Sequence, residues 1–282
     1  MDSNEALKMY MNAITDMDRY LTKYTAYVNA IYEKNSVRYA DKTNEFMARR
    51  KFGPELLANQ QIAYIGSHAE LMNPEYENML MAFGVISPTN YMSIYQDRFM
   101  IPIRNTDGRV INLVGYMWEK DERYVYGTGK YYRRGETFFG LENLGRILDY
   151  GILVWTEGIT DTLAIRDIAV WNSLANCGVR LTPQKLKILN RPRYGDIFIP
   201  DRDEAGDKTR KELKTNRYVL LNIPLGFKDV DEYMNKTENP ELRASRRQQV
   251  YEYIKECERW LMQSIQYGKP CGNVEATMGR IG

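Results

Sequence analysis

The sequence predicts an α/β protein: a parallel sheet with helices on both faces, preceded by a smaller subdomain of helices and a β-hairpin. From residue 151 onward, short apolar runs alternate with segments of helical pattern. Buried strands separated by helices of roughly ten residues are typical of parallel sheets. Upstream, the runs 98–103 and 109–118 flank the turn residues 105–108, which predicts the hairpin.

The elements of the predicted sheet region follow in order along the chain. We expect strands at 151–158, 169–174, 196–200 and 217–224, and helices at 160–168, 182–190 and 205–216. The second of these helices has the clearest start, because Thr182 suits the N-cap and Pro183 the first helical position.

The region before residue 51 is predicted to be helical, since residues 5–50 contain neither Gly nor Pro. Its apolar side chains are spaced alternately by three and four, which gives a heptad seam. The seam comprises Leu7, Tyr10, Ile14, Met17, Leu21, Tyr24, Val28 and Ile31. Either the seam packs on its own domain, or it meets a partner or a second copy of the chain.

The end of the chain carries one further predicted helix, over 239–267, with an apolar stripe that includes Val250 and Leu261. Residues 269–282 show only weak patterning, and we expect disorder there. The predicted divisions are therefore an N-terminal helix (1–40), a first subdomain (41–149), the sheet domain (150–237), and a C-terminal helix and tail (238–282).

The composition excludes several kinds of chemistry. The chain has 282 residues, with 39 Lys and Arg against 37 Asp and Glu, so it carries no uniformly basic coat. Its only histidine is His68, and its three cysteines lack zinc-ligand spacing. Unpaired cysteines fit a reducing cytoplasm. We see no signal peptide and no apolar run of about 18 residues, so we expect no membrane partner.

Acidic residues collect where the predicted strands end. Glu157 follows the first strand, and Asp201 and Asp203 follow the third. A further acidic pair, Asp229 and Asp231, follows the last strand. The carboxyl ends of parallel strands meet at one edge of a sheet, and clustered carboxylates repel unless a cation joins them. The pattern favours Mg²⁺ or Mn²⁺, with a plain surface acidic cluster as the alternative.

A basic, turn-rich stretch at 127–137 precedes the sheet. Lys130, Arg133 and Arg134 alternate there with tyrosines. Such a loop suits phosphate contacts and base stacking, although a solvated loop would have the same composition.

Several segments resemble a known family. TEGITD (156–161) and IPDRDEAGDK (199–208) resemble the TOPRIM fold of primases, topoisomerases and related nucleases. DRFMIPIRNTDGRVINLVGY (97–116) and YYRRGETFFGLENL (131–144) resemble the RNA-polymerase core of bacterial, DnaG-type primases. Two earlier segments, 46–66 and 80–90, are similar to the helical start of that core. The resemblance covers about residues 40–235, and its parts occur in the family's order.

The resemblance implies a role for each matching residue. Glu157, Asp201 and Asp203 match the catalytic, metal-binding acids, and Asp161 matches the acid four residues after that glutamate. Asp229 and Asp231 match the later acidic pair, which we also expect to bind metal. The implied nucleotide- and template-binding residues are Arg50, Arg98, Arg109, Arg123 and Arg134, with Lys130 and Arg133 added by their proximity.

The resemblance implies a DNA primase that synthesises short RNA primers on single-stranded DNA from ribonucleoside triphosphates, by two-metal nucleotidyl transfer. Three departures stand out. The cysteines cannot build the family's zinc-binding domain, Arg202 lies where the family often has glycine, and only residues 238–282 are left for the helicase-contacting region. Such a core would suit a phage or a plasmid, with a replicative helicase or a separate zinc-bearing protein as partner.

Two other functions fit the same residues. A TOPRIM nuclease would share the metal-binding acids but need no ribonucleotide. A non-catalytic replisome adaptor would bind single-stranded DNA and use its N-terminal helix for contacts. A topoisomerase is disfavoured, because the chain is too short for strand-passage domains.

Overall fold

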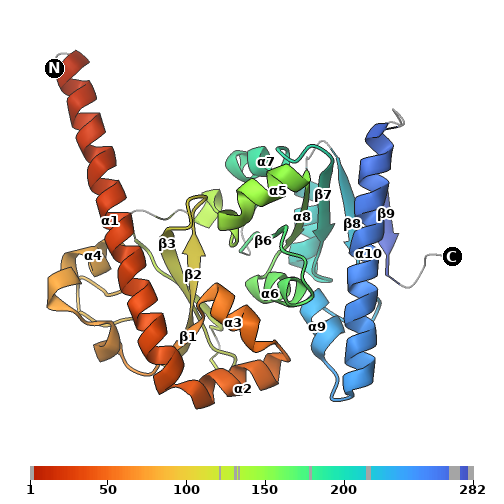
Figure 1. Cartoon of the computed structure of the whole chain (residues 1–282), viewed down its shortest axis with the longest axis horizontal. Coiled ribbons are helices and arrows are strands. Elements are labelled where there is room, and N and C mark those ends of the chain that lie inside the picture. Colours follow the sequence, from red (N-terminus) through yellow and green to blue (C-terminus); the bar gives the residue numbers. More distant parts are fainter. Residues whose placement is uncertain are drawn as a thin grey trace. The chain divides into compact units, whose positions relative to one another are not determined.

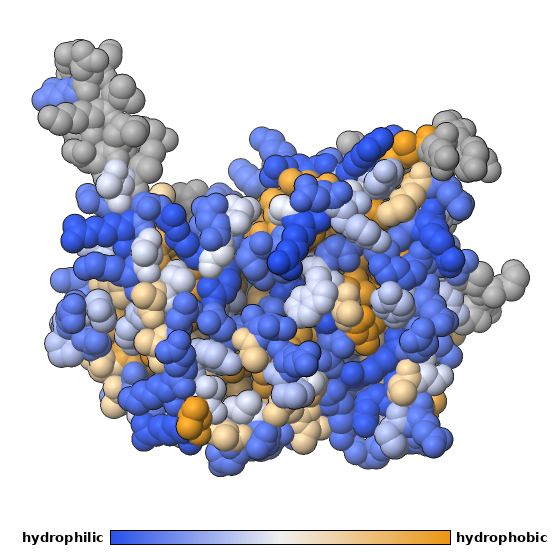
Figure 2. Space-filling model, in the orientation of Figure 1, coloured by the Kyte–Doolittle hydropathy of each residue, from blue (hydrophilic) through white to orange (hydrophobic). Residues whose placement is uncertain are grey.

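The computed structural model describes residues 3–120, 122–129, 132, 134–177, 180–213, 217–266 and 274–278. The chain forms two compact units. The N-terminal unit comprises Met1–Ala48 and Leu57–Tyr132, and the C-terminal unit comprises Arg49–Leu56 and Arg133–Gly282. No helix within the described residues is long and apolar enough to cross a membrane. Where Figure 2 is coloured, most of the surface that it shows is hydrophilic.

The N-terminal unit combines helices with a four-stranded antiparallel sheet in the order β1-β2-β3-β4 (Figure 1). The strands are β1 (Ala63–Ile65), β2 (Arg98–Arg104), β3 (Val110–Tyr116) and β4 (Tyr124–Tyr126), and the helices that lie wholly or partly in this unit are α1 (Ser3–Arg38), α2 (Ala40–Arg50), α3 (Pro54–Gln60) and α4 (Glu77–Ala82). The predicted hairpin is confirmed, because β2 and β3 pair from Phe99↔Tyr116 to Arg104↔Val110 with an irregularity after Ile103.

Helix α1 packs the later part of its heptad seam inside its own unit. Leu21, Tyr24, Val28 and Ile31 are buried in one core cluster. The Tyr24 ring stacks on Phe83, with the ring centroids 3.8 Å apart. The first of the two expectations for the seam, packing on its own domain, therefore holds over these four positions.

The C-terminal unit is a five-stranded, fully parallel sheet in the order β6-β5-β7-β8-β9 (Figure 1). The strands are β5 (Ile152–Thr156), β6 (Ser173–Ala175), β7 (Gly195–Ile199), β8 (Tyr218–Asn222) and β9 (Val274–Thr277). The helices are α5 (Leu144–Tyr150), α6 (Ile159–Asp167), α7 (Pro183–Leu189), α8 (Glu204–Glu212), α9 (Val230–Asn235) and α10 (Pro240–Gln266). The predicted α/β class, with its parallel sheet and helices on both faces, is confirmed.

Each face of this sheet has its own apolar layer. On one face, residues of α5 and α7 pack in a cluster with Trp155 and Phe198. The rings of these two residues stack, with their centroids 3.8 Å apart. The alternate residues of β5 and β7, which point to the opposite face, are buried as well, and α6 and α10 contact these strands. Because both faces are covered, the strands are nearly continuous apolar runs, which is the pattern that revealed them.

Two predicted elements differ from the structure. The expected strand 169–174 is shifted to Ser173–Ala175, because Ala169 adopts a left-handed backbone (φ 65°) and residues 169–172 form the turn after α6. The expected disorder over 269–282 is wrong for 274–277, which form β9 and pair with β8 from Val219↔Val274 to Asn222↔Thr277. Backbone hydrogen bonds to the open edge of β8 stabilise this strand, and its composition carries no comparable signal.

Candidate metal centre

The acids at the strand ends lie close together. Strands β5 and β7 are neighbours and end at Thr156 and Ile199, so the residues that follow them emerge at the same edge. The Asp201 backbone N–H donates to Glu157 Oε1 at 3.3 Å, and Thr209 Oγ1 donates to Glu157 Oε2 at 3.5 Å. The structure thus brings the first two predicted acids into contact across neighbouring strands.

A glycine makes this close approach possible. A Cβ atom at Gly206 would lie 2.1 Å from the Asp201 carbonyl oxygen and 3.0 Å from Glu157 Oε1. Any side chain would therefore push the start of α8 away from the acids. The glycine of the Asp-x-Asp-x-Ala-Gly pattern is explained by this lack of space.

Two of the aspartates also begin helices. Asp203 is the N-cap of α8 and accepts from Gly206 N at 3.0 Å through Oδ1. Asp229 is the N-cap of α9 and accepts from Glu232 N at 2.7 Å through Oδ1. Each cap holds its carboxylate in one orientation. For Asp203, the second oxygen is then directed at the cation described below.

Burial and mutual repulsion make the acid cluster costly to ionise. Burial, with the Asp203 charge, raises the pKa of Glu157 to about 6. Burial, followed by the charges of Glu157 and Asp229, raises the pKa of Asp201 to about 7. Burial raises the pKa of Asp161 as well. Asp203 differs: although burial raises its pKa, the Gly206 N–H and Lys228 bring the value below the ordinary one.

The ammonium group of Lys228 already faces two of these carboxylates. Lys228 Nζ lies 3.3 Å from Asp203 Oδ2 and 3.9 Å from Asp201 Oδ2. The two aspartates therefore stabilise a positively charged group placed near both of them. Within the described part of the chain, no three His, Cys, Asp or Glu side chains are arranged as a set of metal ligands.

The donor set fits a hard divalent ion. The candidate ligands are carboxylate oxygens, and together they carry more negative charge than Lys228 neutralises. The Lys228 ammonium lies within ion-pair distance of both Asp201 and Asp203, so positive charge is already accommodated there. Glu157, Asp201 and Asp203 are the residues that would hold the ion, after rotation of their side chains.

Asp231, the last of the predicted acids, uses both of its oxygens within the protein. Arg50 Nη1 donates to Oδ2 at 2.6 Å, and Asn235 Nδ2 donates to Oδ1 at 2.7 Å. Its backbone N–H donates to Asp161 Oδ1 at 3.2 Å. Burial raises the pKa of Asp231 to about 6, and the Arg50 charge opposes that rise. Asp161 and Asp231 thus form an inner acidic pair behind the other acids.

The predicted basic residues are divided between the units. Arg98, Arg109 and Arg123 belong to the N-terminal unit, whereas Arg50 and Arg134 belong to the C-terminal unit. Arg98 is buried and donates to the carbonyl oxygens of Glu122 and Arg123, at 2.8 and 3.3 Å. Arg109 forms an ion pair with Asp18.

Arg134 contacts the loop after β6. Its Nε and Nη2 both donate to the Cys177 carbonyl oxygen, at 2.9 and 2.7 Å. Lys185 lies in the same region and donates to the carbonyl and side-chain oxygens of Asn176, at 2.6 and 2.7 Å. The predicted residues Lys130 and Arg133 lie outside the described residues.

Sequence reasoning overlooked Lys228 and Lys185. Lys228 directly precedes the acidic pair of KDVDEYM, and its position beside that pair was the available signal. For Lys185 no signal exists, because a lysine on a short helix is normally solvated.

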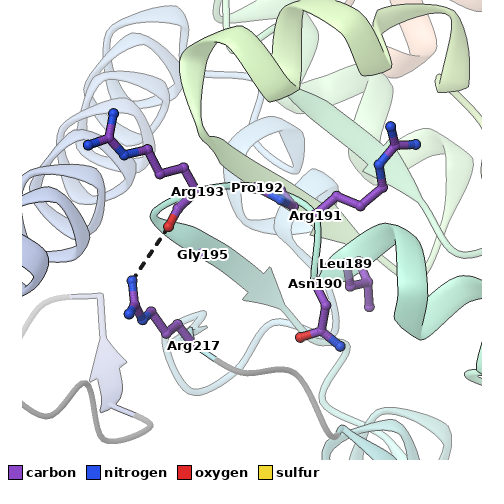
Figure 3. Close-up of a pocket in the computed structure, with 7 residues that line it drawn as sticks. All are labelled: Leu189, Asn190, Arg191, Pro192, Arg193, Gly195 and Arg217. Atoms are coloured by element: carbon purple, nitrogen blue, oxygen red, sulfur yellow. Dashed lines mark hydrogen bonds between the residues drawn. The ribbon is translucent and has the colours of Figure 1, made fainter.

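A hollow of about 290 Å³ opens at the opposite edge of the same sheet, near the start of β7. It is lined by Leu189, Asn190, Arg191, Pro192, Arg193, Gly195 and Arg217. Figure 3 shows the guanidinium groups of Arg191 and Arg193 pointing away from each other, and Arg217 donates to the Arg193 carbonyl oxygen at 3.5 Å. The arginines do not converge on one point, so this hollow is not the candidate site.

Two family models match the chain. The model of the Toprim-like domain matches residues 154–234, and the model of the DNA primase catalytic core, N-terminal domain, matches residues 30–144. The acid-bearing parallel sheet is therefore a Toprim-like domain. Since the primase-core model matches directly upstream of it, residues 30–234 are similar to the N-terminal and Toprim-like domains of a DnaG-type DNA primase catalytic core. Primase cores with a Toprim domain depend on metal ions.

Individual relatives agree with this assignment. The DNA primase of Aquifex aeolicus is 27% identical over 222 residues, which is 72% of this chain and 44% of that protein. A solved DnaG primase catalytic domain bound to single-stranded DNA superposes with a TM-score of 0.67 at 20% identity, covering 83% of this chain and 80% of that one. The Aquifex aeolicus primase structure with zinc-binding and RNA-polymerase domains gives 0.66 at 22% identity, covering 89% and 67%. The chain thus matches less than half the length of its Aquifex relative, and the structures share its fold.

Proposed function

We propose that this chain is a DNA primase that synthesises short RNA primers on single-stranded DNA during replication. The observation that carries the proposal is the meeting of Glu157, Asp201 and Asp203 at one sheet edge, in a chain whose upstream residues match the primase core. That upstream match favours a primase over a Toprim nuclease. The related catalytic domain bound to single-stranded DNA supports the choice of template.

In the proposed reaction, the primer 3′-hydroxyl oxygen attacks the α-phosphorus of a ribonucleoside triphosphate, and pyrophosphate leaves. Bound Mg²⁺ or Mn²⁺ would offset the charge that develops on the attacking and leaving oxygens. Glu157, Asp201 and Asp203 would hold the metal, and the Asp203 N-cap would fix the direction of its free oxygen. Asp229 lies next to this set, while Asp231 would act through Arg50.

The proposed template- and nucleotide-binding residues are Arg50, Arg98, Arg109, Arg123, Lys130, Arg133 and Arg134. Contacts between guanidinium groups and phosphates would supply most of the affinity for nucleic acid, so binding should weaken with salt. A replicative helicase or a zinc-bearing protein is a proposed partner, and the cytoplasm the proposed location. The proposed divisions remain 1–40, 41–149, 150–237 and 238–282.

The direct test is incorporation of labelled ribonucleotides on a single-stranded DNA template with Mg²⁺ or Mn²⁺. Asp201→Ala and Asp203→Ala should each reduce synthesis by at least about a hundredfold, the scale of losing one electrostatic contact to the transition state. Asp207→Ala is the matched control, because this exposed aspartate on α8 pairs with Arg210 and not with the site. Unchanged synthesis in both site variants would refute the metal assignment, and DNA cleavage without nucleotides would indicate the nuclease.

A further inference from the structure

The Lys228 ammonium reaches the acid cluster from outside the strands that carry it. Lys228 lies in the loop between β8 and α9, whereas Asp201 and Asp203 follow β7. Its Nζ contacts the Oδ2 atom of both aspartates. One side chain from a neighbouring loop therefore faces both carboxylates of the Asp-x-Asp pair.

The loop that carries Lys228 is fixed at its backbone. The Lys228 N–H donates to Glu232 Oε2 at 2.6 Å, and the Lys228 carbonyl oxygen accepts from Arg202 N at 2.7 Å. Arg202 Nε also donates to the Ile223 carbonyl oxygen at 2.9 Å. The residue in the middle of the Asp-x-Asp pair thus ties the aspartate loop to the lysine loop at two points, which glycine could do at only one.

The Lys228 side chain is the most exposed member of this cluster of three. It is 57% exposed, while the Asp201 side chain that it faces is 16% exposed. The ammonium can therefore rotate into solvent without any change in the two tied loops. An incoming cation would meet the same two carboxylates after that rotation.

We propose that Lys228 is a built-in counter-cation of Asp201 and Asp203, which neutralises the pair before metal binding and is displaced into solvent when a divalent ion binds. This inference rests on the proposed metal site. The lysine lowers the repulsion that would otherwise open the cluster, and it competes with the metal for the same oxygens. Arg202 keeps the lysine within reach during each exchange.

Titration calorimetry with Mn²⁺ alone tests the competition. Lys228→Met should bind Mn²⁺ about fivefold more tightly than the wild type, the scale set by a partly exposed ion pair. Lys228→Arg keeps the charge and should bind like the wild type. Lys236→Met is the matched control, because Lys236 pairs with Glu232 on α9, and its affinity should be unchanged.

Thermal unfolding gives a second readout. Without metal, Lys228→Met should melt below the wild type, because nothing offsets the paired aspartates. At saturating Mn²⁺ the difference should close, since the metal replaces the lysine charge.

Three outcomes separate this inference from the proposed function. If Asp203→Asn binds Mn²⁺ as tightly as the wild type, the metal site is not where we place it, and the metal assignment of the proposed function fails. If Asp203→Asn weakens Mn²⁺ binding but Lys228→Met binds Mn²⁺ no more tightly than the wild type, the metal site stands and only the role of the lysine is overturned. A raised KM for ribonucleotides in Lys228→Met, with unchanged Mn²⁺ affinity, would also overturn it and make Lys228 a nucleotide contact.

Discussion

The Arg50 guanidinium lies 2.6 Å from the Asp231 carboxylate and joins residues 181 positions apart in the sequence. The pair anchors the segment Arg49–Leu56 to the Toprim-like domain, and two contacts reinforce it. Asp167 accepts from Gly53 N at 3.0 Å, and the Lys51 carbonyl oxygen accepts from Arg247. A short segment from the first third of the chain is thereby built into the domain that carries the acids.

Removal of one partner from this pair should be strongly destabilising. The Asp231 side chain is 6% exposed, so Arg50→Met leaves a buried carboxyl group without its cation. We expect a loss of about 3 kcal/mol in the free energy of unfolding, measured by chemical denaturation. Lys51→Met is the control, because its partner Glu238 is 91% exposed, and it should cost less than about 1 kcal/mol. Equal losses in both variants would contradict this account.

The pKa of Asp201 predicts how the metal-free protein responds to pH. Its folded value of about 7 lies above the ordinary 3.8, so the folded state retains a proton that the unfolded state releases. Stability should therefore fall as the pH rises from about 4 to 7. Asp201→Asn lacks this titration and should show a shallower fall when both proteins are denatured in the presence of a chelator. A steeper fall in the variant would be inconsistent with a raised pKa.

Lys185 predicts the opposite slope at higher pH. Burial lowers its pKa to about 8, from an ordinary 10.5, so the folded state loses its proton first. The stability of the wild type relative to Lys185→Met should therefore rise by about 1–3 kcal/mol between pH 8 and 10. Because tyrosines titrate in both proteins, the difference between them is the quantity to measure. A flat difference across this range would argue against a buried, charged Lys185.

The two halves of the α1 seam should respond differently to substitution. Leu21 is buried in the core of the N-terminal unit, whereas Met17 is 43% exposed. Leu21→Asp should lower the melting temperature by several degrees, since it buries an unpaired charge. Met17→Asp should change it little. Loss of self-association in Leu21→Asp at an unchanged melting temperature would instead show an intermolecular seam at that position.

Much of the fold could be predicted because the parallel strands are buried on both faces and therefore apolar throughout. The meeting of Glu157 with Asp201 followed from the same reasoning, since neighbouring parallel strands end at one edge. The division of labour among the acids could not be predicted. Asp229 and Asp231 are equivalent in the sequence, but only the structure shows that Arg50 and Asn235 occupy both oxygens of Asp231. Contacts across 181 positions leave no local pattern.

Strand β9 completes the outer edge of the Toprim-like sheet with residues Val274–Thr277, beyond the end of α10. A chain shortened at Gln266 would retain every acid of the candidate site and every helix described here, yet it would leave the outer backbone groups of β8 unpaired. Such an open edge is a template for pairing with another polypeptide. Residues 274–277 cover that edge, so truncation after Gln266 should favour edge-to-edge association without removing any acid of the candidate site.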